Sequence, residues 1–173
     1  MIHRNGLHRF LSTALLLFTV AISSLGQAGP KKPRELGDYS PGTLKEISER
    51  KGTAAENSNK NITIHGKIFP TRVTVVFEGA FRPLPQNKKD TIAAWANRFA
   101  GAPETYTRPY QQEVLVSEDG SKHWLAVRTE LLPKFEQELK KGDTVDLCLI
   151  KLGSARNGKE WQPVLLVEKF LKP

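Results

Sequence analysis

The 173-residue sequence contains one cysteine, and no apolar run approaches the ~20 residues that a membrane-spanning helix needs. A single cysteine excludes an intramolecular disulfide, and the histidines do not stand at the spacing of a zinc site. The chain also lacks a Gly-x-Ser-x-Gly nucleophile elbow. Its glycine-rich segment 153–158 does not complete a P-loop, which ends on lysine followed by serine or threonine. These absences argue against most enzyme chemistry, and we predict no catalytic residue, metal or cofactor.

The first 28 residues have the pattern of a secretory signal. Arg4 and Arg9 supply the positive start, residues 14–22 form a short apolar stretch, and small residues occupy the −3 and −1 positions of a cleavage site after Ala28. We therefore predict a periplasmic or secreted protein with residues 1–28 removed. An uncleaved N-terminal anchor is the alternative.

The rest of the chain keeps an excess of positive charge. The whole sequence carries 26 basic and 18 acidic side chains, and the signal removes only two of the basic ones. This balance favours an anionic partner, such as an envelope polysaccharide, a lipid head group or nucleic acid. The basic residues are scattered, however, so an ordinary soluble surface explains them as well.

Two regions follow the signal. Residues 29–60 are rich in Gly, Pro and polar side chains, which predicts a flexible leader with one short helix that begins at Ser40 and Pro41. Residues 61–173 alternate between apolar and polar side chains over several stretches, which predicts a β-rich domain.

The apolar spacing in this second region predicts an ordered series of elements. Asp119-Gly120 marks a hairpin turn, and Asp90 is a suitable N-cap for a helix inside a proline-punctuated insertion. Residues 62–77 are predicted to form one bent strand or, alternatively, a tight hairpin. The other predicted elements are an insertion helix over 90–99, a hairpin over 113–128, a helix over 131–139, a buried strand over 144–152 and a closing strand over 162–170.

This order of elements resembles that of the OB-fold, a small Greek-key barrel. The resemblance covers about 110 residues at the level of the fold and points to no particular family. It implies a mainly β protein with helices (α+β), built as a five- to six-stranded barrel. One helix would lie between strands 3 and 4, and a helical insertion between strands 1 and 2. A different small mixed α+β barrel is the alternative architecture.

Three side chains carry groups that could act as a nucleophile or a base. Cys148 stands between two leucines in a predicted strand, where a buried cysteine behaves as a small hydrophobe. His65 and His123 alternate with apolar residues in predicted strands, so each could face solvent or the mouth of a barrel. We interpret both as solvated histidines, because the sequence places no carboxylate partner beside them.

The OB-fold resemblance implies a ligand surface on strands 2 and 3 and in the loops that join strands 1 to 2 and 4 to 5. Aromatic and cationic side chains are interleaved in those loops, a mixture that suits sugar rings, anionic glycans or stacked bases. The candidate ligand-binding residues are Arg82, Tyr106, Arg108, Tyr110, Arg156, Lys159 and Trp161. The aromatic residues could instead simply cover the ends of the barrel.

Taken together, these features predict an exported, non-catalytic binding or accessory module. Its expected partner is an anionic envelope component, a glycan or another protein. The alternatives are a nucleic-acid-binding OB-fold protein and a small hydrolase that uses His65 or His123.

Overall fold

The computed structural model describes residues 34–50, 57–59, 61–101 and 103–172. The predicted signal over residues 1–28 lies outside the described residues. From Arg34 onward the chain forms one compact unit. Among the described residues, no helix is both long enough and apolar enough to cross a membrane.

The protein is mainly β with helices, as the sequence predicts. Within the described residues, eight strands form one mixed sheet in the order β1-β4-β5-β6-β8-β7-β3-β2. The strands are β1 (Ser40–Pro41), β2 (Asn57–Asn59), β3 (Ile62–Ile64), β4 (Thr71–Pro83), β5 (Tyr110–Glu118), β6 (Ser121–Arg128), β7 (Thr144–Asn157) and β8 (Glu160–Leu171). The α-helices are α1 (Leu44–Glu49), α2 (Gln86–Phe99), α3 (Pro103–Thr107) and α4 (Leu132–Glu138), and the 3-10 turns are η1 (Leu36–Asp38) and η2 (Thr129–Leu131).

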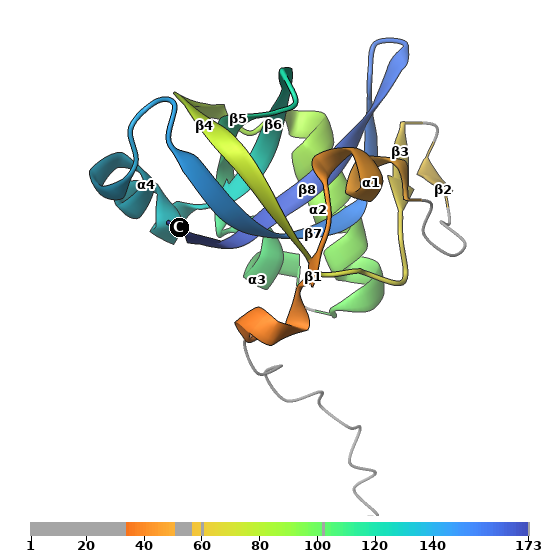
Figure 1. Cartoon of the computed structure of the whole chain (residues 1–173). Coiled ribbons are helices and arrows are strands. Elements are labelled where there is room, and N and C mark those ends of the chain that lie inside the picture. The colour runs from red at the N-terminus through yellow and green to blue at the C-terminus, as the bar shows by residue number, and fades with distance from the viewer. Residues whose placement is uncertain (1–33, 51–56, 60, 102, 173) are drawn as a thin grey trace, which may run out of the picture. The chain divides into compact units, whose positions relative to one another are not determined.

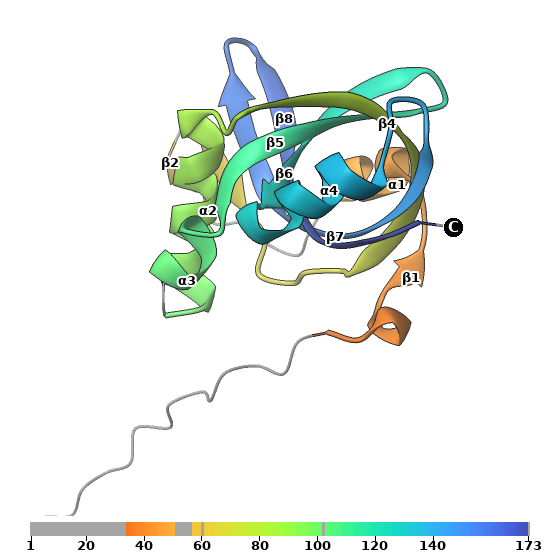
Figure 2. The same cartoon turned by 90° about the vertical axis from the view of Figure 1, so that its left-hand side faces the viewer.

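Five of these strands close a ring of pairings (Figure 1). β4 pairs with β5 and with β7, β5 pairs with β6, and β7 pairs with β8, all in antiparallel fashion. The ring is completed by a parallel pairing of β6 with β8. Helices α2 and α3 connect β4 to β5, and α4 connects β6 to β7. In Figure 2 the ring is turned so that α4 lies in front of it.

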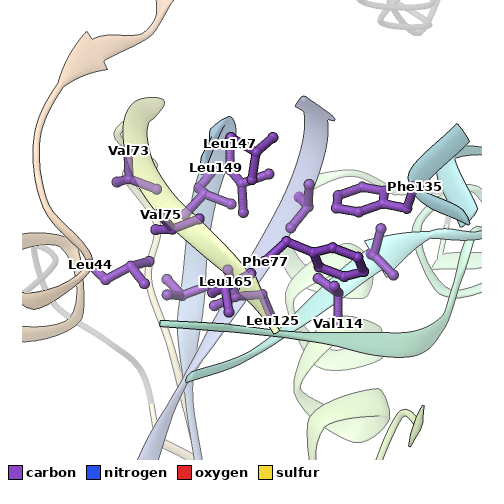
Figure 3. Close-up of a cluster of buried hydrophobic side chains, with 14 of the residues drawn as sticks. Leu44, Val73, Val75, Phe77, Val114, Leu125, Phe135, Leu147, Leu149 and Leu165 are labelled. Carbon is purple, nitrogen blue, oxygen red and sulfur yellow. The ribbon is translucent and has the colours of Figure 1, made fainter. Parts of the chain in front are cut away.

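The inside of the ring holds the first hydrophobic core, because every second residue of the ring strands points inward. Val73, Val75 and Phe77 follow this alternation in β4, and all three are buried. Helices α1 and α4 add Leu44 and Phe135, which lie at opposite ends of the cluster in Figure 3. The two helices therefore close the two ends of this core.

The opposite face of the sheet carries a second core, which is covered by α2. Ile92 and Trp95 of α2 pack there against outward-facing residues of the sheet, including Ile150 and Leu152 of β7. β7 supplies both cores, since Leu147 belongs to the first. This agrees with the prediction of a buried strand over 144–152.

Three local predictions differ from the structure. The expected bent strand over 62–77 is two separate strands, because β3 pairs with β7 at a different place from β4. Helix α1 begins at Leu44, with Thr43 rather than Ser40 as its N-cap, since Thr43 and Glu46 form a reciprocal capping box.

The third difference concerns the insertion helix, which begins one turn earlier than Asp90. Pro85 precedes its first residue, Gln86, and supplies a fixed backbone angle suited to a helix start. Asp90 then lies in the second turn, where its carboxylate accepts a hydrogen bond from the Gln86 side chain at 2.7 Å.

Leu147→Ala is expected to lower the free energy of unfolding by about 2–5 kcal/mol. The Leu147 side chain is fully buried in the first core, so truncation removes apolar contacts and leaves a cavity. Urea denaturation of both proteins measures the loss. Leu36→Ala is the control, because Leu36 is exposed and its truncation should change stability by less than about 0.5 kcal/mol. A loss below ~1 kcal/mol at Leu147 would contradict its central position.

Candidate functional site

The seven candidate ligand-binding residues occupy three places in the fold. Arg82 lies near the end of β4. A second group, Tyr106, Arg108 and Tyr110, lies on α3, the turn after it and the start of β5. The third group, Arg156, Lys159 and Trp161, lies at the hairpin between β7 and β8.

The β7–β8 hairpin brings its three candidates together at an exposed tip. Arg156 and Trp161 are paired across the two strands, and Lys159 lies in the turn between them. The Trp161 side chain is 49% exposed, and both cations are exposed as well. The hairpin projects from the ring, as the blue ribbon in Figure 1 shows. It therefore presents an aromatic ring beside two positive charges.

The two tyrosines of the second group are packed against other side chains. Tyr106 contacts Trp95 with the ring centroids 5.2 Å apart and the rings nearly edge to face. Tyr110 is buried in the second core, and burial raises the pKa of its hydroxyl. In this arrangement Tyr110 has no surface for a ligand. Arg108, by contrast, is exposed.

Arg82 belongs to a charged network on the outer face of the ring. Its guanidinium contacts the Glu113 carboxylate, with Nη2 2.6 Å and Nε 2.7 Å from Oε2. Glu113 is fully buried and also accepts a hydrogen bond from the ammonium group of Lys88, which is only 3% exposed. Lys88 donates a further hydrogen bond to the Trp124 carbonyl at 3.2 Å. Two cations thus share one carboxylate, and the network keeps one positive charge.

Trp124 completes this network with an aromatic ring. The Arg82 guanidinium lies 4.1 Å from the centroid of the Trp124 ring, which is a cation–π contact. Neighbouring residues of β6 and β5, Leu125 and Val114, point into the first core, so Trp124 and Glu113 face outward. The outer face of β5 and β6 therefore carries Arg82, which is paired with Glu113 and stacked on Trp124.

Helix α2 connects this strand face to the hairpin. The side chain of Asn87 donates a hydrogen bond to the backbone carbonyl of Arg156 at 2.9 Å. The next residue, Lys88, contacts Glu113 on β5. The strand face and the hairpin therefore each contact the first turn of α2.

Sequence reasoning missed Lys88, Glu113 and Trp124 as members of this network. Lys88 did leave a signal, because it lies four residues before Ile92 on the apolar stripe of α2. A charged residue on such a stripe requires a buried partner. The sequence did not show that the partner is Glu113, 25 residues away.

The two histidines occupy different surroundings. His123 lines a cleft of about 280 Å³ between α1 and the β5–β6 hairpin, together with Glu118 and Ser121. The Glu118 carboxylate is already engaged, since it accepts hydrogen bonds from the backbone N–H groups of Leu44 and Lys45. Among the described residues, no side chain hydrogen-bonds the imidazole of His123 or of His65, and no cluster of metal-ligating side chains occurs.

No protein-family model matches the chain, and no curated protein matches it in sequence. Its function is therefore inferred from its own residues.

Proposed function

We propose that the protein is an exported, non-catalytic binding module that recognises an anionic glycan or a similar component of the cell envelope. We propose further that its ring of strands is an OB-like barrel. The pairing order β4-β5-β6-β8-β7, with α4 after the third ring strand, supports this reading. The helical insertion between β4 and β5 corresponds to the long loop expected between the first two strands.

The observation that carries the proposal is that aromatic and cationic side chains gather at two places, each of which contacts the first turn of α2. One is the stack of Arg82 (β4) on Trp124 (β6), and the other is Trp161, Arg156 and Lys159 at the hairpin tip. Strands 2 and 3 and the loop between strands 4 and 5 are where OB-folds bind their ligands. Aromatic rings offer apolar faces to sugars, and the neighbouring cations attract carboxylate or sulfate groups.

Export is the second part of the proposal. The sequence of residues 1–28 supports it through the positive start, the short apolar stretch and the small residues before Gly29. A protein outside the cytoplasm meets glycans and lipid head groups more readily than nucleic acid. The same Arg82–Trp124 stack would nevertheless suit a nucleic acid base, so nucleic acid is retained as the second candidate ligand.

The test compares the wild-type protein with the variant Arg156→Gln/Lys159→Gln/Trp161→Ala. Wild type is expected to be retained on immobilised polygalacturonate at low salt and not on neutral dextran. The variant should bind at least about tenfold more weakly, because it loses an aromatic face and two charges of the surface. Its melting temperature should stay close to that of wild type, since exposed hairpin side chains contribute little to stability.

The matched control is Lys134→Gln/Lys140→Gln, which removes the same charge from exposed positions on α4 and on the segment after it. If the control loses as much binding as the hairpin variant, the loss comes from the lower net charge alone. That result would refute a site at the hairpin. A single-stranded oligothymidylate is the third probe. If it binds more tightly than polygalacturonate, with a steep loss of affinity in salt, nucleic acid is the ligand instead.

A further inference from the structure

A small basic pocket lies at the C-terminal end of α1, where the helix meets β7 and the segment after β3. Its lining residues are Ile47, Arg50, His65, Lys67, Phe69 and Lys151. Four of the six are basic, and none is acidic. Among the described residues, no carboxylate pairs with Arg50, Lys67 or Lys151. Within the part of the chain that the structure describes, the pocket therefore gathers positive charge without a compensating acid.

Lys151 anchors the inner wall of this pocket. Its side chain is buried, and its ammonium group donates hydrogen bonds to the backbone carbonyls of Ser48 at 2.5 Å and Arg50 at 3.0 Å. These carbonyls belong to the end of α1, which needs donors because its last carbonyls have no partner within the helix. An ammonium group has three N–H donors, so one remains for a ligand.

His65 forms a second wall and is only 8% exposed. Its backbone is held on both sides, because its N–H donates to the Leu152 carbonyl at 2.8 Å and its carbonyl accepts from Trp95 Nε1 at 2.9 Å. Within the described part of the chain, its imidazole has no hydrogen-bond partner. This imidazole therefore lines the pocket with ring nitrogens that no described residue binds.

Two exposed cations stand at the mouth of the pocket. The Arg50 guanidinium lies 5.1 Å and the Lys67 ammonium 5.0 Å from the centroid of the Phe69 ring. The sum of these two distances is the upper limit on the separation of the two charges. Phe69 contacts both side chains through cation–π interactions.

Without a bound anion, these positive charges disfavour the protonated forms of one another. Burial, followed by the charge of Arg50, lowers the pKa of Lys151. Burial, followed by the charge of Lys151, lowers the pKa of His65. A bound anion would oppose both effects, because it stabilises the protonated forms of its neighbours.

We propose that this pocket binds a phosphate group, with Lys151 and His65 contacting one oxygen inside and Arg50 and Lys67 contacting the others at the mouth. The pocket has a volume of about 10 Å³, which is enough for one water-sized atom. One phosphate oxygen fits there, and the rest of the group stays between the two exposed cations. A doubly charged phosphate suits three full positive charges better than a single carboxylate does. This site lies outside the proposed glycan surface and does not rest on it.

The experiment is calorimetric titration of the full mature chain with sodium phosphate at pH 7 and constant low ionic strength. Wild type should bind one phosphate per chain, and Arg50→Gln/Lys67→Gln should weaken binding at least about tenfold. Both side chains are exposed, so this variant should fold normally. The charge-matched control Arg108→Gln/Lys134→Gln should bind phosphate as wild type does. Equal weakening in the control, or no saturable binding by wild type, overturns the proposal.

The second readout is the imidazole NMR signal of His65. Added phosphate should shift this signal and raise the pKa of His65, while the signal of His123, in the separate cleft between α1 and the β5–β6 hairpin, stays unchanged. A shift of both histidines, or of neither, contradicts the site. Glycerol 3-phosphate serves as the second titrant. Tighter binding of this ester than of inorganic phosphate assigns the pocket to a phosphate carried on a larger molecule, and the reverse assigns it to the free anion.

Discussion

Replacing Glu113 with glutamine is expected to lower the free energy of unfolding by about 3–5 kcal/mol. Glu113 is fully buried and is the shared partner of Lys88 and Arg82. Glutamine keeps the shape of the side chain but removes its charge. The buried ammonium group of Lys88 then has no counter-charge, and the cost of taking it out of water is no longer offset.

The double variant Lys88→Met/Glu113→Leu separates this explanation from a loss of packing. It removes both buried charges, so it should be much more stable than Glu113→Gln alone. Chemical denaturation of wild type, Lys88→Met, Glu113→Leu and the double variant gives the coupling energy. A loss in the double variant equal to the sum of the two single losses would contradict a direct Lys88–Glu113 interaction.

The pH dependence of Glu113→Gln gives a further check on Lys88. Burial already lowers the pKa of Lys88, and Glu113 opposes this shift. Without Glu113 the folded-state pKa falls further below that of the unfolded chain. The unfolded state then binds more protons, so the stability of the variant should rise with pH until the unfolded lysine titrates near 10.5.

Gly153→Ala is the second change with a large expected effect, because the sheet leaves no room for a Cβ atom at this position. An added Cβ would lie 1.9 Å from the Thr63 carbonyl oxygen on β3, which is backbone and cannot rotate away. We expect β3 to separate from β7 and to expose Ile62 and Ile64, at a cost of about 1.5–3 kcal/mol for each isoleucine.

Urea denaturation measures this loss, and hydrogen exchange at the β3 amides locates it. The control is Gly37→Ala, since nothing lies within 4 Å of a Cβ at Gly37 and its φ is not in the left-handed region. That variant should stay within about 0.5 kcal/mol of wild type. A Gly153→Ala protein with wild-type stability and protected β3 amides would show that β3 can be moved aside without cost.

Local signals in the sequence were enough to predict the β5–β6 hairpin and its turn. Asp119 and Gly120 both adopt positive φ, 49° and 78°, as a two-residue turn of this type requires. Alternating apolar residues likewise predicted the part of β4 over residues 73–77, because Val73, Val75 and Phe77 point into the first core. Turn chemistry and alternation depend on neighbours in the chain, and a sequence shows neighbours directly.

Features that depend on distant segments could not be predicted. The split between β3 and β4 is an example, since β3 lies against β7 where Gly153 allows the backbones to approach. The surface beside α2 is another. Glu113 precedes an apolar stretch, and nothing in the sequence indicates that Lys88 contacts it. Arg82 was therefore predicted as a site residue without its ion pair to Glu113.

The pairing of β8 has a consequence for folding kinetics. β8 supplies Leu165 and Val167 to the first core and Val164 and Leu166 to the second. Its parallel pairing with β6 joins segments that are about forty residues apart, which slows folding. Neither core can close before β8 has paired with β6 and β7, so we expect the two cores to form together.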